Sequence, residues 1–352
     1  MTTEQRIQAF VALGHEIRQL LEHPESQALH VRQQQLKSLA GNLYLSNAWF
    51  SPDQVEQALR GLVKLLDEAS LRSWLQSYMD HLEQPSDSTI GVVMAGNLPA
   101  VGFHDLLCVL ISGRKLTAKL SSDDRLLLPA LAAMLVAIEP GFADRIHFSD
   151  GKLLPFKAII ATGSNNSSRY FEYYFAQYPR IIRKSRTSIA ILNGQETEAD
   201  LTSLANDVFS FYGMGCRNIT NLYLPEGFSP IRFLEQCGHW SHLQHHSKYF
   251  HNYEYHRAGF LINQIAHFDN GFLLLKEDEA WQSPVAVLHY SMYTDYATVK
   301  AEILKRREEI QVVAMLSPDP DLQAVPLGTT QMPGPADYAD GVDTLQFILH
   351  NT

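Results

Sequence analysis

Apolar residues recur at helical spacing through the first 85 or so residues of the chain. One stripe consists of Ile7, Phe10, Leu13, Ile17, Leu20 and Leu21. This spacing places apolar side chains on one face of a helix. Ser51 and Pro52 have the order of a helix cap and a first helical residue, and a second stripe follows them. The first 87 residues are therefore expected to be mainly helical.

Beyond residue 88 the pattern changes to short apolar runs that alternate with helical segments. The runs typical of buried strands are residues 90–95, 115–120, 158–161, 188–192 and 219–224. Helical patterns cover residues 104–112, 126–138 and 169–177, and another helix is expected from about residue 200. Strands that alternate with short helices indicate a parallel sheet covered on both faces. The predicted fold class is α/β.

Composition and charge narrow the class of protein further. The 352 residues suggest two domains, and 45% hydrophobic with 19% charged residues excludes disorder as the main state. A formal net charge of −10 disfavours a nucleic-acid partner, which would need a basic excess. The sequence shows no run of about 18 apolar residues, so no membrane span is expected. Three cysteines and a polar N-terminus favour a reducing, cytoplasmic compartment.

Among the three cysteines, Cys216 has the most suggestive surroundings. It lies between Gly-Met-Gly and Arg217, where a helix is expected to end and a strand to begin. Glycines would let a substrate carbonyl approach, and Arg217 would favour the nucleophilic thiolate. Buried packing is the alternative, as for many single cysteines. Cys108, inside an apolar run, is expected in the core, and Cys237 is expected to be structural.

Two polar segments could bind ligands. Residues 163–168, Gly-Ser-Asn-Asn-Ser-Ser, follow a strand and open a helix, so their backbone N–H groups could face a phosphate. An ordinary capped turn explains this segment equally well, because the three-glycine dinucleotide fingerprint is missing. Six histidines crowd residues 239–256. We expect no metal there, and favour a solvated helix that faces an oligomer partner or a substrate entrance.

Longer segments resemble a known family. Residues 90–124, IGVVMAGNLPAVGFHDLLCVLISGRKLTAKLSSDD, resemble the aldehyde dehydrogenase segment that runs from the strand ending in Pro-Trp-Asn to the strand ending in Val-Lys-Pro. The tail from Gln331 to Phe347 resembles the end of bacterial acyl-CoA reductases related to the LuxC fatty-acid reductase subunit. The resemblance covers residues 88–350. It implies an aldehyde dehydrogenase-like fold, with a cofactor-binding domain over residues 1–193 and a catalytic domain over residues 194–352.

The resemblance also implies catalytic roles. Cys216 would attack an acyl-CoA carbonyl and release CoA, and Asn97 would donate to the resulting oxyanion. Hydrolytic relatives carry a glutamate that activates water, but the corresponding residues 182–188 contain no carboxylate. The implied activity is reduction of acyl-CoA to aldehyde. The alternatives are an acyl-carrier-protein thioester donor, another oxidoreductase of this type, or a catalytically silent nucleotide-binding scaffold.

Cofactor residues follow from the same resemblance. Lys119 would contact the adenosine ribose, Gly163 and Ser164 the pyrophosphate, and Glu279 the nicotinamide ribose, with Trp281 near the ring. Ser122 stands where NAD-preferring relatives carry a glutamate, so NADPH is expected in preference to NADH. The superfamily makes a homodimer a reasonable expectation. A basic cluster, Arg180, Arg183, Lys184 and Arg186, would either meet CoA or cofactor phosphates or form a solvated strand edge.

Overall fold

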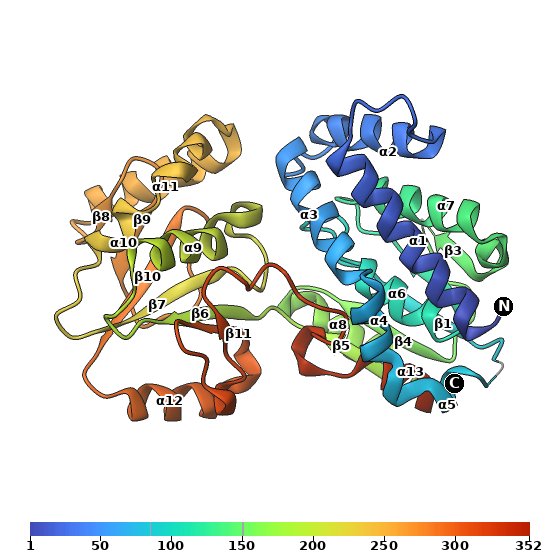
Figure 1. Cartoon of the computed structure of the whole chain (residues 1–352). Helices are drawn as coiled ribbons and strands as arrows, with labels where there is room; N and C mark the ends of the chain where they lie inside the picture. The colour runs from blue at the N-terminus through green and yellow to red at the C-terminus, as the bar shows by residue number, and fades with distance from the viewer. Residues whose placement is uncertain (85, 150) are drawn as a thin grey trace. The chain divides into compact units, whose positions relative to one another are not determined.

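The computed structural model describes residues 1–84, 86–149 and 151–352. The chain forms two compact units, one made of Met1–Ser185 with Pro333–Thr352, and the other of Arg186–Met332 (Figure 1). Each unit contains a mainly or wholly parallel sheet with helices packed on it. The predicted α/β class is confirmed. None of the described helices combines the length and apolarity needed to cross a membrane.

The N-terminal segment is helical, as predicted. Its helices are α1 (Thr3–Glu22), α2 (Val31–Asn42), α3 (Pro52–Leu65), α4 (Glu68–Leu75) and α5 (Met79–Leu82). Local sequence sets where they begin. Thr2 and Gln5 form a capping box at α1, and the Asp67 carboxylate accepts from the Ser70 N–H at the start of α4.

The first sheet is parallel and has the order β3-β2-β1-β4-β5 among the described residues. Its strands are β1 (Thr89–Val93), β2 (Lys115–Lys119), β3 (Ile146–Ser149), β4 (Ala158–Thr162) and β5 (Arg180–Arg183). The accompanying helices are α6 (Phe103–Ile111), α7 (Leu127–Ile138), α8 (Asn165–Tyr174) and α13 (Thr344–His350). The sequence did not predict β3 and β5, because both are four-residue edge strands and β5 carries an arginine at each end.

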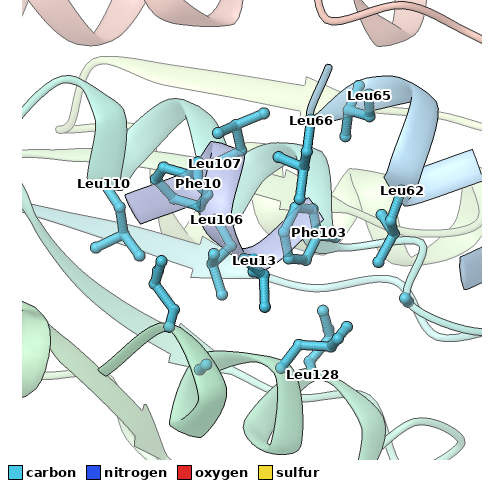
Figure 2. Packing of buried hydrophobic residues seen from close by; sticks show 14 of the residues in the cluster. Phe10, Leu13, Leu62, Leu65, Leu66, Phe103, Leu106, Leu107, Leu110 and Leu128 are labelled. Carbon is cyan, nitrogen blue, oxygen red and sulfur yellow. The ribbon is translucent and has the colours of Figure 1, made fainter. Parts of the chain in front are cut away.

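The core of this unit lies where α1, α3, α6 and α7 meet the sheet. Figure 2 shows Phe10 and Leu13 of α1 packed beside Phe103 and Leu106 of α6, all four buried. Each such side chain contributes about 1.5–3 kcal/mol by leaving water. The packed layer holds α6, and therefore the loop that precedes it, against the sheet, where α6 contacts β2.

The second sheet has the order β12-β11-β6-β7-β10-β9-β8. Its strands are β6 (Thr187–Ile191), β7 (Ile219–Pro225), β8 (Phe268–Asp269), β9 (Leu274–Glu277), β10 (Val287–Tyr293), β11 (Ile310–Met315) and β12 (Val325–Pro326). All neighbours pair in parallel except β8 with β9. Its helices are α9 (Glu198–Phe209), α10 (Ile231–Glu235), α11 (Ser247–Ile262) and α12 (Tyr296–Lys305).

The compact units differ from the expected ranges 1–193 and 194–352 at two places. Strand β6 pairs with β7 and β11, so the second unit begins at Arg186. The tail Pro333–Thr352 returns to the first unit, where the Trp74 indole N–H donates to the Tyr338 hydroxyl at 2.7 Å. Periodicity along the chain carries no information about such a return.

A buried ion pair ties this tail to the first sheet. The Arg183 guanidinium lies 2.7 Å from the Asp105 carboxylate of α6 and donates to the Thr344 hydroxyl of α13. Arg183 is only 6% exposed, so neither interpretation of the basic cluster applies to it. Arg180 is exposed and pairs with Glu172 at 2.9 Å.

Candidate active site

Three loops that carry predicted site residues share one edge of the first sheet. Lys119 at the end of β2 pairs with Val93 of β1, and Val93 pairs with Ala161 of β4. Because all three strands are parallel, the loops that follow them emerge side by side. In the sheet, β2 and β3 lie on one side of β1, and β4 and β5 lie on the other, so the direction in which strands are added reverses between β1 and β4. Open α/β sheets bind ligands at such a position.

The loops after β1 and β2 are fastened together by Asp124. Its carboxylate accepts from the Ala100 N–H at 2.9 Å and from the Leu127 N–H at 3.2 Å. Burial raises the pKa of this carboxyl, while the backbone N–H bonds oppose that rise. Gly96 permits the close approach, since a Cβ there would lie 2.4 Å from the Ser121 Cβ. The sequence raised Asp124 only as an alternative ligand for the cofactor ribose and did not predict that it fastens these loops, since it does not stand directly before the helix Leu127–Ile138.

Asn97, Lys119 and Ser122 are exposed on these fastened loops. The structure therefore brings the predicted oxyanion donor and two predicted cofactor residues to the same edge. Asp123 is exposed beside Ser122, whereas the Asp124 carboxylate is turned onto backbone N–H groups. Asn97, Lys119 and Ser122 thus lie exposed at one edge of the sheet, where the Ser122 hydroxyl donates to the Asp123 carboxylate at 3.5 Å.

Gly163 and Ser164 lie between β4 and the start of α8. The Ser164 hydroxyl caps the helix by accepting from the Ser167 N–H at 3.2 Å. A Cβ at Gly163 would lie 2.9 Å from Ser167 Cβ, so only glycine lets the chain turn this closely. The first N–H groups of a helix have no carbonyl partner within it and form its positive end. This turn, with Lys119 on the same sheet edge, fits a phosphate-bearing cofactor.

The second unit carries Cys216 on the turn between α9 and β7. Cys216 is exposed, whereas Cys108 and Cys237 are buried, as predicted for the latter two. Burial raises the pKa of both buried thiols far above the usual range, which disfavours their thiolates. Arg217 donates to the Thr330 carbonyl at 3.5 Å. Among the three thiols, Cys216 alone is exposed.

The chain reverses sharply before this turn. Phe211, Tyr212 and Gly213 have φ angles of 51°, 59° and 74°, so three consecutive residues are left-handed. This conformation costs about 1–2 kcal/mol for each non-glycine residue. The Tyr212 ring stacks on His246 with centroids 4.4 Å apart, which helps to hold the reversal. The sequence suggested only a helix that runs into this segment.

The segment Glu279–Trp281 is attached to the beginning of β7. The Thr220 hydroxyl donates to the Trp281 carbonyl at 2.5 Å, and the Asn221 amide donates to the Ala280 carbonyl at 3.0 Å. Glu279 is exposed. The strand that follows the Cys216 turn, β7, therefore also holds the predicted ribose-binding segment through hydrogen bonds.

Trp281 has a different place from the one expected. Its side chain is 3% exposed and its indole N–H donates to the Tyr223 hydroxyl at 2.7 Å. The Arg306 guanidinium lies 3.7 Å from the ring centroid. Trp281 is therefore a core residue rather than one that presents its ring to a nicotinamide, because its hydrogen bond and its packing both lie inside the second unit.

The histidine-rich stretch forms a short helical segment, Gly238–His245, followed by α11. The His246 ring accepts from the Tyr249 N–H and caps α11. Across the described ranges, His, Cys, Asp and Glu side chains form no group of three that could hold a metal ion. His246 thus serves as a helix cap, and His239, His242 and His256 pack against neighbouring aromatic rings.

Solved structures with the same architecture include aldehyde dehydrogenases and an NADP dependent enzyme. A mutant of P. syringae AldA indole-3-acetaldehyde dehydrogenase in complex with NAD+ and IAA matches 92% of this chain and 75% of its own, at 12% identity and a TM-score of 0.61. M. tuberculosis aldehyde dehydrogenase complexed with NAD+ matches the same shares at 13% identity and a TM-score of 0.58. An E. coli NADP dependent enzyme matches 90% and 78% at 13% identity and a TM-score of 0.56.

The chain thus has the aldehyde dehydrogenase fold. A family model, acyl-CoA reductase (LuxC), matches residues 2–231, which is most of the chain. The protein belongs to this acyl-CoA reductase family, and the resemblance stated from the sequence is confirmed. The comparison with curated proteins finds no match.

Proposed function

We propose that this protein reduces an acyl-CoA to the corresponding aldehyde through a thioester on Cys216. The observation that carries the proposal is the exposure of Cys216 on a glycine-flanked turn in a chain of the acyl-CoA reductase family. Burial of the two other cysteines leaves no competing nucleophile of this type. The same turn leads into β7, which is hydrogen-bonded to the segment Glu279–Trp281.

The acylation step needs a thiolate and a donor to the oxyanion. The Cys216 sulfur attacks the carbonyl carbon and its electron pair forms the new C–S bond, while the carbonyl oxygen takes the negative charge. That oxyanion then collapses, the bond to the CoA sulfur breaks, and CoA leaves as its thiolate. We assign Asn97 to the oxyanion through its exposed amide.

The residues at the edge of the first sheet fit a nicotinamide nucleotide. The helix start at Gly163 and Ser164 would hold the pyrophosphate and Lys119 the adenosine ribose, and Glu279 of the second unit is proposed for the nicotinamide ribose. When bound, the reduced cofactor supplies the hydride. Ser122 is exposed and neutral and its hydroxyl donates to Asp123 at 3.5 Å, whereas a carboxylate at position 122 would repel a 2′-phosphate. We therefore propose NADPH as the preferred cofactor.

Release by water is expected to be slow. Residues 182–188 contain no carboxylate, and Arg183 within them is committed to Asp105. A site without a base at that position leaves the thioester to the reductive step or to returning CoA. The acyl-enzyme should therefore persist when reduced cofactor is withheld.

Intact-mass spectrometry tests the proposal directly. The protein is incubated with acyl-CoAs of increasing chain length without cofactor, and the adduct is located by peptide mapping. One acyl group on Cys216 is expected, to be lost as aldehyde when NADPH is added. Cys216→Ala should carry no adduct, and Cys237→Ala serves as the matched control. Aldehyde formation at the normal rate by Cys216→Ala would exclude the thioester route, and an acyl carrier protein as donor is tested in the same assay.

A further inference from the structure

The Cys216 turn is held by a buried amide two residues further along the chain. Asn218 is fully buried, and its Oδ1 accepts from the Gly215 N–H at 2.8 Å. Its backbone N–H donates to the Gly215 carbonyl at 3.0 Å. These two bonds flank Cys216 and close the turn around it.

The other end of the Asn218 amide is anchored to α9. Its Nδ2 donates to the carbonyls of Asp207 at 3.0 Å, Val208 at 3.3 Å and Ser210 at 2.8 Å. The last carbonyls of a helix have no partner within it, so a buried donor here satisfies groups that would otherwise be costly. The side chain thus joins the end of α9 to the turn.

A second hold comes from β6. The Ser188 hydroxyl donates to the Cys216 carbonyl at 2.8 Å and accepts from the Val312 N–H at 3.1 Å. Ser188 is fully buried. The backbone on both sides of the Cys216 side chain is therefore fixed from two elements of the same unit.

We propose that Asn218 is a positioning residue that sets the direction of the Cys216 thiol, with Ser188 as a second support. This inference rests on the proposed function for the role of Cys216. The side chain of Cys216 is exposed, so its direction depends strongly on the backbone of its turn. A displacement of about 1 Å at a reacting atom can cost about 100-fold in rate. Loss of the Asn218 amide should therefore slow the chemistry without weakening substrate binding.

The chain offers a matched control in Asn221. It is also fully buried, and its Nδ2 donates to the carbonyls of Asp278 at 3.1 Å and Ala280 at 3.0 Å. Asn221 lies on β7, whose first residue follows Asn218 directly, but it makes none of the bonds that close the Cys216 turn. Truncation of either asparagine removes a buried amide, so both variants should lose stability, and only one should disturb the thiol.

The experiment measures the acylation half-reaction, which requires no nicotinamide, by rapid quench for wild type, Asn218→Ala, Ser188→Ala and Asn221→Ala. The maximal acylation rate of Asn218→Ala is expected to fall about 10- to 100-fold, with the half-saturating acyl-CoA concentration changed less than about threefold. Ser188→Ala should fall several-fold. Asn221→Ala should stay within about threefold of wild type at a similar loss of melting temperature. If Asn218→Ala does not fold, Ser188→Ala carries the comparison.

Alkylation of Cys216 by iodoacetamide between pH 6 and 10 separates this inference from the proposed function. If wild type forms no acyl adduct, the proposed function fails, and the alkylation rates still test whether Asn218 positions the Cys216 thiol. If Asn218 does so, the limiting alkylation rate of Asn218→Ala should change at least threefold with an unchanged thiol pKa, and the rate of Asn221→Ala should not change. Equal effects in both variants, or none in Asn218→Ala, would overturn the inference.

Discussion

The two units each carry candidate site residues, and they use opposite hydrogen-bonding chemistry to hold the loops on which these residues lie. In the first unit the loops after β1 and β2 lead into helices, and the Asp124 carboxylate accepts N–H groups from Ala100 and Leu127. In the second unit the Cys216 turn leaves a helix, and the Asn218 amide donates to three carbonyls at the end of α9. A helix start offers spare donors and a helix end spare acceptors.

The difference explains why a charged side chain holds the loops of the first unit and a neutral side chain holds the Cys216 turn. An acceptor at a helix start can be a carboxylate, which also favours the positive end of the helix. An ionised carboxylate cannot donate to carbonyls, so a neutral amide stands beside Cys216. The amide has no charge to lose with pH, and it adds no negative charge that would raise the pKa of a neighbouring thiol.

The largest expected effect tests whether the first unit contributes to chemistry as well as to binding. Asn97→Ala should slow acylation by about 100- to 1000-fold, because one donor to the oxyanion is lost. Rapid-quench rates with saturating acyl-CoA measure this, and the melting temperature should change little because Asn97 is exposed. A loss of stability that matches the loss of rate would show that Asn97 is a structural turn residue.

The next largest effect concerns Asp207, a buried carboxyl group of the second unit that, like Asp124 in the first, accepts from backbone N–H groups. Asp207 accepts from the Thr330 N–H at 3.0 Å and the Gly328 N–H at 2.6 Å, and burial raises its pKa from 3.8 to about 6. The folded state therefore disfavours the ionised form of Asp207. Its stabilising contribution is complete below about pH 4 and is lost as pH rises through 6, by on the order of 3 kcal/mol.

Chemical denaturation of wild type and Asp207→Asn between pH 4 and 8 measures that contribution. The asparagine variant cannot ionise, so the free energy of unfolding of wild type relative to the variant should fall across this range. Parallel curves for the two proteins would contradict the raised pKa of Asp207.

A smaller effect is expected from the loop clamp of the first unit. Asp124→Ala leaves two buried N–H groups without their acceptor and loosens the loops that carry Asn97 and Lys119. The dissociation constant of NADPH should rise about tenfold, measured by fluorescence titration. The alkylation rate of Cys216 should stay at the wild-type value, and a parallel change in that rate would show that the two regions do not act separately.

The smallest effect concerns cofactor choice. Ser122→Glu should shift the ratio of kcat/KM for NADPH over NADH towards NADH by several-fold, since a carboxylate repels a 2′-phosphate. Ser122→Ala is the control for loss of the hydroxyl alone. A wild-type enzyme that prefers NADH tenfold would defeat the assignment and direct attention to the exposed Asp123.

Much of the fold could be predicted from local pattern. The expected strands at residues 90–95, 115–120 and 158–161 correspond to β1, β2 and β4. The expected helix at 169–177 begins earlier, at Asn165, because its polar first turn has no apolar stripe and is started by the Ser164 cap. Short edge strands such as β5 carry too few apolar residues to stand out from a loop.

The sequence alone determined the class of fold and the family, and it predicted Cys216 as the nucleophile among three cysteines, because apolar periodicity, glycine spacing and motif order are local properties. Tertiary structure decided which polar residues are buried and what they hold. Arg183 and Trp281 looked available to ligands, yet one pairs with Asp105 and the other donates to Tyr223. The sequence predicted no role for Asn218, because the four hydrogen-bond partners of its side chain become neighbours only when α9 ends and the chain turns back into β7. The physical reason is that a polar side chain acquires its role from the unpaired backbone groups around it, and folding alone brings those groups together.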